Sequence, residues 1–147
     1  MSDSDLFRLY SERILALAAD MPKTAPLPHV TNSATRRAPL CGSTITVDLL
    51  VEKGVVTDYA QDIRACALGQ ASAAIFGAMV VGRTKEQIVI LRDQLRAMLK
   101  GGPVPDAPFG EYEVLTAARE YPNRHGSIML APEATITALD AADLPST

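Results

Sequence analysis

The stretch APLCGSTITVDLLVEKGVVTDYAQDIRACALGQASAA, residues 38–74, decides the fold. Within it, residues 44–51 alternate between apolar and mostly polar side chains, which is typical of a strand with one buried face. Glu52-Lys53-Gly54 predicts a hairpin turn, and residues 55–63 predict the returning strand. The alanine-rich run from Cys66 to Val81 is too long and too poor in β-branched residues for another strand, so it predicts a helix.

Other elements are expected on both sides of this hairpin. Apolar residues at helical spacing predict an amino-terminal helix over residues 4–19, and residues 30–40 predict a weak first strand. Thr84-Lys85-Glu86-Gln87 matches a capping box, and the apolar stripe behind it predicts a helix that ends before Gly101. Two further helices are expected near the carboxyl end, over residues 112–119 and 132–139.

The order of these elements, strands first and helices after, predicts an α+β fold. We expect a small antiparallel three-stranded sheet packed with about five helices. A chain of 147 residues is long enough for one hydrophobic core. Residues 1–147 are therefore expected to form a single domain, with strands over about 30–64 and helices over 66–141.

Composition excludes several classes of partner. The net charge is −3, and the longest cationic run is Arg36-Arg37, so no nucleic-acid partner is expected. The most apolar stretch, residues 71–82, is about half as long as a membrane span, so no membrane partner is expected. The chain does not open with an export signal, which predicts a cytoplasmic protein with reduced thiols.

The chain contains two cysteines, Cys41 and Cys66. On the predicted hairpin, Cys41 precedes one strand and Cys66 follows the other, so both thiols are expected at the same end of the sheet. Cys66 also opens a helix, where free N–H groups favour the thiolate that binds metal or attacks sulfur. Two thiols do not define a metal site, however, and free cysteines are often simply buried. Spacing alone leaves both interpretations open.

Four motifs follow one another in a distinctive order. They are Pro39-Leu40-Cys41-Gly42 before a strand, Cys66-Ala67 at the head of a helix, the helix from Arg83 to Leu99, and Tyr121-Pro122-Asn123-Arg124 before residues 127–134. This order resembles the iron–sulfur cluster assembly scaffold family, which comprises IscU, SufU and the amino-terminal domain of NifU, and the resemblance implies a SufU/IscU-like fold. It covers residues 4–141, and a long insert after Cys66 and the lack of a Leu-Pro-Pro-Val-Lys stretch make the chain most similar to SufU.

The resemblance implies a function, cargo and partners. In this family a cysteine desulfurase passes a persulfide to a scaffold cysteine, and three thiolates and an aspartate hold zinc or build a cluster. The chain is thus expected to be a SUF-type scaffold or sulfur carrier rather than an enzyme. Its cofactor would be a transient iron–sulfur cluster or zinc, or no metal. Its partners would be a cysteine desulfurase and other assembly proteins.

Two of the family's four ligand positions carry other residues here. Cys41 and Cys66 match the first two cysteines and are the candidate sulfur acceptors and ligands. Ser43 replaces the aspartate. Alignment on Leu130-Ala131 places Ser127 at the third cysteine, whereas alignment on the neighbouring histidine places Gly126 there. A neutral hydroxyl is a poor ligand for zinc or iron.

His125 is the leading candidate to complete the site with Cys41 and Cys66, because neutral imidazole is a good ligand for zinc and iron. The alternative is a surface loop histidine. Three functions therefore remain: a scaffold or sulfur carrier, a metal-free interaction module of the assembly machinery, and a zinc-dependent sulfurtransferase. We favour the first, because both retained cysteines lie where sulfur transfer needs them.

Overall fold

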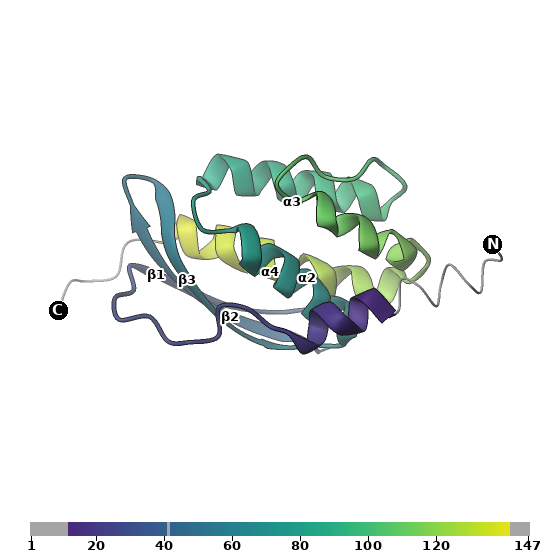
Figure 1. Ribbon diagram of the computed structural model, residues 1–147, viewed down its shortest axis with the longest axis horizontal. Coiled ribbons are helices and arrows are strands. Elements are labelled where there is room, and N and C mark those ends of the chain that lie inside the picture. Colours follow the sequence, from purple (N-terminus) through teal and green to yellow (C-terminus); the bar gives the residue numbers. More distant parts are fainter. Residues whose placement is uncertain (1–11, 41, 142–147) are drawn as a thin grey trace.

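The computed structural model describes residues 12–40 and 42–141 (Figure 1). Its three strands form one antiparallel sheet in the order β1-β2-β3. The described part contains five helices, which confirms the predicted α+β class. The strands are β1 (Asn32–Arg37), β2 (Thr44–Glu52) and β3 (Val55–Arg64). The helices are residues 12–19, α2 (Ala67–Met79), α3 (Lys85–Leu99), the 3-10 helix η1 (Gly110–Glu120) and α4 (Pro122–Asp140). The part of the predicted first helix before residue 12 lies outside the described residues.

The β2–β3 hairpin has the predicted turn. Glu52 pairs with Val55, and the two residues between them, Lys53 and Gly54, have φ angles of 52° and 78°. Positive φ at both central positions is what a type I′ turn requires, and its twist matches that of the strands. The other end of the hairpin is closed by the pair Thr44 and Arg64. This end of the sheet is where the cysteine-bearing segments are expected to meet.

The core lies on one face of the sheet. Ile45, Val47 and Leu49 on β2 are fully buried, and burial of each such side chain contributes about 1.5–3 kcal/mol. Helix α2 packs over β3, and α4 packs over β1 and β2, while α3 and η1 form an outer layer (Figure 1). Thus α2 and α4 lie side by side between the sheet and the outer helices.

The prediction for the last helix was wrong about its start. Residues 132–139 were expected to be helical, but α4 begins ten residues earlier, at Pro122, and contains Pro132 in its interior. A proline inside a helix cannot donate to the carbonyl four residues before it, so the carbonyl of Ile128 loses its helical partner. Ser72 on α2 donates its hydroxyl to this oxygen at 2.6 Å. A tertiary contact therefore gives the Ile128 carbonyl a hydrogen-bond donor, and the helix continues where the local sequence suggested a break.

Two other helices agree with the sequence more closely. The capping box of α3 is present, with Gln87 N donating to the Thr84 hydroxyl and the Gln87 side chain accepting from Thr84 N. The short helix expected over residues 112–119 exists as η1, but with 3-10 geometry and slightly longer. Arg119 at its end donates to the carbonyl oxygens of Met98 and Gly102, both at 2.6 Å. These bonds tie η1 to the carboxyl end of α3.

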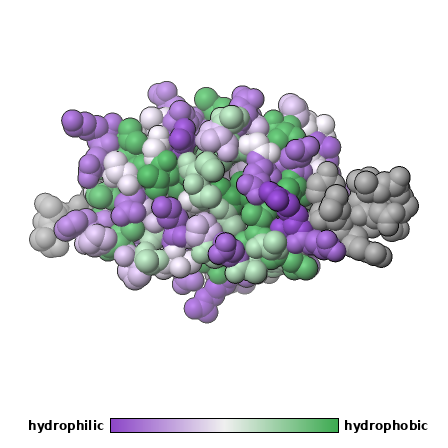
Figure 2. Space-filling model, viewed as in Figure 1, coloured by the Kyte–Doolittle hydropathy of each residue, from purple (hydrophilic) through white to green (hydrophobic). Residues whose placement is uncertain are grey.

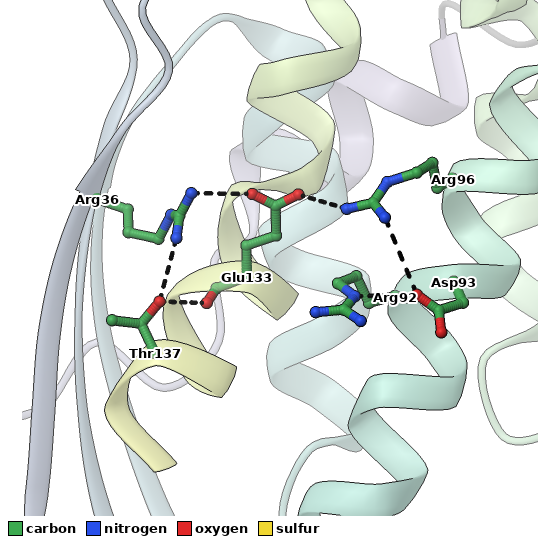
Figure 3. Close-up of polar contacts among 6 residues, drawn as sticks. All are labelled: Arg36, Arg92, Asp93, Arg96, Glu133 and Thr137. Atoms are coloured by element: carbon green, nitrogen blue, oxygen red, sulfur yellow. Dashed lines mark hydrogen bonds and ion pairs between the residues drawn. The ribbon is translucent and has the colours of Figure 1, made fainter. Parts of the chain in front are cut away.

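Charged side chains join the layers at the surface. Glu133 on α4 accepts from Arg36 on β1 at 3.3 Å and from Arg96 on α3 at 3.2 Å (Figure 3). Figure 2 shows hydrophilic side chains spread over the viewed face, with smaller apolar areas between them. Among the described helices, none has the length and apolar character needed to cross a bilayer.

Candidate functional site

Cys66 lies at the N-cap of α2, as the sequence predicts. Its backbone is extended, with φ −64° and ψ 171°, and its carbonyl accepts the first helical bond from Gln70 N at 2.9 Å. The cysteine side chain makes no capping bond to the helix. The residue is half-buried, so the thiol is anchored by the helix start and partly open to solvent.

The thiol contacts Ser127, which is one of a hydrogen-bonded pair of buried serines. Ser127 Oγ lies 3.7 Å from Cys66 Sγ and donates to Ser43 Oγ at 3.0 Å. Ser127 is 1% exposed and Ser43 is 4% exposed. The three residues come from the start of α2, the first half of α4 and the segment just before β2. The structure therefore links Cys66, through Ser127, to Ser43, and these are the two serines that the resemblance places at ligand positions.

Gly69 makes the close approach of α2 and α4 possible. A Cβ at this position would lie 2.1 Å from Ser127 Oγ and 2.8 Å from Ala65 Cβ. No side chain fits there without displacing Ser127 from Cys66. Sequence reasoning missed this residue, although a glycine inside an alanine-rich helix is a signal of close packing.

A second buried polar network fixes the same part of α4. Ser72 Oγ donates to Ile128 O, and the Tyr112 hydroxyl donates to Ser72 O at 3.1 Å. Burial raises the pKa of Tyr112 well above its usual value, so its phenol stays neutral and remains a hydrogen-bond donor. Because Ile128 follows Ser127 directly, this network holds Ser127 in register with α2. Sequence reasoning missed this network too, since its members are 40 and 56 residues apart.

The segment before β2 forms a tight turn that carries Ser43. Gly42 has a φ of 70°, its N–H donates to Ala38 O at 2.9 Å, and Ala38 N donates to Ser43 O at 2.8 Å. Cys41 lies outside the described residues, so its predicted approach to Cys66 remains a prediction. Its neighbours Gly42 and Ser43 do lie at the Cys66 end of the sheet. Leu40 is 82% exposed on the other side of Cys41 in the chain.

His125 belongs to the first turn of α4 and is partly buried, so it is not the surface loop residue of the alternative interpretation. Its Nε2 lies 2.8 Å from Ala118 O. A carbonyl oxygen only accepts, so Nε2 carries the proton and Nδ1 keeps its lone pair in the neutral ring.

The position of His125 in α4 separates it from the cluster around Cys66. Residues two apart in a helix do not share a face, and His125 precedes Ser127 by two. The structure brings Ser127, rather than His125, to Cys66. A Cβ on Gly126 would point to Ala38 Cβ, at 3.6 Å, rather than to the thiol, and this favours the alignment that places Ser127 at the third cysteine.

The donor set around Cys66 does not fit the family's metal ligands. Within residues 12–40 and 42–141, no three His, Cys, Asp or Glu side chains are grouped closely enough to hold a metal ion. The side chain that meets Cys66 is instead the neutral hydroxyl of Ser127, which donates to a second neutral hydroxyl, that of Ser43. Zinc sites use thiolate, imidazole and carboxylate ligands, which leaves Cys66 as the single ligand of that kind in the described cluster.

Comparisons with known proteins agree on one class of relative. No family model matches the chain. The scaffold protein IscU for iron–sulfur cluster assembly from Thermotoga maritima is 28% identical over 137 residues, which cover 93% of this chain and 96% of the relative. The protein of the same description from Streptococcus pyogenes serotype M1 is 28% identical over 87 residues, which cover 58% of this chain and 55% of the relative.

Solved structures extend this likeness to the fold. The amino-terminal domain of a nitrogen-fixing NifU-like protein from Brucella abortus superposes with a TM-score of 0.84 at 38% identity, covering 88% of this chain and 91% of that one. A candidate scaffold protein for the SUF system of Fervidobacterium islandicum superposes with a TM-score of 0.80 at 20% identity. That second match covers 90% of this chain and 98% of the other, and shows the shared fold.

Proposed function

The chain belongs to the IscU/NifU amino-terminal family of iron–sulfur cluster assembly scaffolds, and on this premise we propose that it accepts sulfur from a cysteine desulfurase. Cys66 and Cys41 are the acceptor thiols and the ligands of the cargo. The proposed setting is the cytoplasm, with a SUF-type desulfurase and other assembly proteins as partners. The observation that carries the proposal is the half-buried Cys66 thiol at the start of α2.

The transfer step conserves electrons overall. Cys66 Sγ, as thiolate, attacks the outer sulfur of the persulfide on the desulfurase cysteine. One S–S bond forms to Cys66 while the S–S bond to the desulfurase cysteine breaks, and the electron pair leaves on the desulfurase sulfur. The N-cap position supports this step because it leaves the thiol partly exposed at the amino-terminal end of α2, which is the positive end of the helix dipole.

Cargo is held by the two thiols with help from further ligands. Soft thiolates suit iron–sulfur centres and zinc, and Cys41 and Cys66 are the two family positions that keep them. His125 is the proposed third ligand, through Nδ1, since its Nε2–H bond to Ala118 O fixes the tautomer that this requires. Because His125 and Ser127 lie on different faces of α4, this role requires the first turn of α4 to reorient.

The second candidate is a metal-free interaction module of the same machinery. The observation in its favour is the replacement of two ligands by the hydrogen-bonded pair Ser43 and Ser127. Such a module would bind the desulfurase without taking up sulfur. A sulfurtransferase with its own turnover would instead raise the rate of desulfurase turnover.

Sulfur loading separates these functions. We expect the chain to gain one or more sulfur atoms after incubation with a cysteine desulfurase and free cysteine, detected by alkylation and mass spectrometry under nitrogen. Replacing Cys66 or Cys41 by serine (C66S, C41S) should abolish this loading. The control is Ser33→Ala, at a partly buried position on the sheet face opposite the core, and it should load normally. Unchanged loading in both cysteine variants contradicts the proposal, and binding of desulfurase without any loading supports the interaction module.

A further inference from the structure

The serine pair Ser127 and Ser43, next to Cys66, bears on whether the site retains a metal ion. We infer that Ser127 and Ser43 prevent this chain from keeping a zinc ion of its own, while leaving Cys66 free for sulfur. These two positions then separate a sulfur-accepting site from a zinc-retaining one. The inference rests on the proposed function only in taking Cys66 as the working thiol.

The distance between Cys66 and Ser127 is that of two ligands of one metal ion. In a tetrahedral zinc site with Zn–S bonds of about 2.3 Å, two sulfur ligands lie about 3.8 Å apart. Cys66 Sγ and Ser127 Oγ are separated by 3.7 Å. The Ser127 oxygen therefore occupies the place at which a third thiolate would stand, and Gly69 keeps that place open by the absence of a Cβ.

The chemistry at this place is nevertheless wrong for zinc. Metal ligands must give up their protons, and a serine hydroxyl keeps its proton at neutral pH. The Ser127 hydroxyl donates to Ser43, which itself replaces the family's carboxylate. Two anionic ligands are thus exchanged for two neutral groups that bond to each other. Sulfur acceptance needs one nucleophilic thiol, so this exchange does not impede it.

Burial holds this arrangement in place. Ser127 is 1% exposed, and its oxygen lies between Cys66, Ser43 and the backbone of α2 at Gly69. Neighbouring Ile128 is held by Ser72, so a rotation of the first half of α4 that brought another side chain to Cys66 would break that hydrogen bond. A cysteine at position 127 would place its sulfur on the same side of α4, facing Cys66.

Zinc content of three proteins tests the inference. Wild type, Ser127→Cys and the matched control Ser127→Ala are loaded with zinc chloride, passed over a desalting column and analysed for bound metal. We expect Ser127→Cys to retain about one zinc ion per chain, and wild type and Ser127→Ala to retain at least ~10-fold less. Stoichiometric zinc in the wild type, or zinc-free Ser127→Cys protein with native circular dichroism, overturns the inference.

A second variant covers the case in which Ser127→Cys does not fold, since sulfur is larger than oxygen and Gly69 is close. Ser43→Asp restores the carboxylate from the β2 side, and it should raise zinc retention above that of wild type. Ser43→Asp protein that folds and gains no zinc overturns the inference. Sulfur loading of the wild type by the desulfurase is measured separately, so loss of loading counts against the proposed function and leaves the zinc result to decide this inference.

Discussion

The two halves of α4 contact the rest of the molecule in different ways. In the first half, Ser127 donates to Ser43, and the carbonyl of Ile128 accepts from Ser72. Both hydrogen bonds are buried and join neutral groups. In the second half, Glu133 reaches the surface and forms ion pairs with Arg36 and Arg96, whose side chains are more than 40% exposed (Figure 3). The end of α4 beside Cys66 thus depends on short-range polar contacts in the core. The other end depends on ion pairs, which water and salt screen.

This difference predicts unequal sensitivity to mutation. A buried polar group that loses its partner costs about 1–3 kcal/mol, because it is left without a hydrogen bond away from water. An exposed ion pair contributes at most about 1 kcal/mol. Disturbing the first half of α4 should therefore change both stability and chemistry, whereas disturbing the second half should change stability slightly and leave the chemistry intact.

The largest effect is expected for Gly69→Ala. The added methyl group meets Ser127 Oγ at 2.1 Å, so α2 and α4 must separate or Ser127 must move. We expect the free energy of unfolding to fall by about 3 kcal/mol, measured by urea denaturation. The matched control is Gly110→Ala at the start of η1, where an added Cβ has no neighbour within 4 Å. Equal stability of the two variants contradicts the tight packing of α2 on α4.

An intermediate effect is expected at alkaline pH. Burial raises the pKa of Tyr112 in the folded state, so the unfolded chain releases this proton first. The stability that Tyr112 contributes is complete below about pH 10 and is lost as the pH rises further, by about 1.4 kcal/mol at pH 11. Urea denaturation between pH 9 and pH 11 measures this loss, and Tyr112→Phe should show a smaller one. If the free energy of unfolding falls equally with pH in wild type and in Tyr112→Phe, groups other than Tyr112 cause the loss.

The smallest effect is expected for Glu133→Gln. This change removes the carboxylate that bridges β1 and α3, and it should lower the free energy of unfolding by about 0.5–1 kcal/mol at low salt. In 1 M sodium chloride the difference from wild type should shrink, because the charges are screened. Glu113→Gln, at an exposed position outside this network, is the control. Sulfur loading should be unaffected, and a loss of loading in Glu133→Gln would break the distinction between the two halves of α4.

Most of the fold could be read from local pattern. The alternation in β2 and the glycine of the turn are local signals, and the Thr84 capping box marked the start of α3 to the residue. The start of α4 could not be read in this way, because Pro132 is a local signal against a continuous helix. What stabilises that helix is the hydroxyl of Ser72, which comes from another helix.

The sequence by itself determined the element order, the resemblance to the scaffold family and the replacement of an aspartate and a cysteine at Ser43 and a position near His125. These features depend on residue type and spacing along the chain. Only the tertiary structure decided that Ser127 rather than Gly126 or His125 meets Cys66. The reason is geometric: which side chain of α4 faces α2 depends on the rotation of one helix against the other, and Gly69, Ser72 and Ile128 set that rotation through contacts between residues far apart in the sequence.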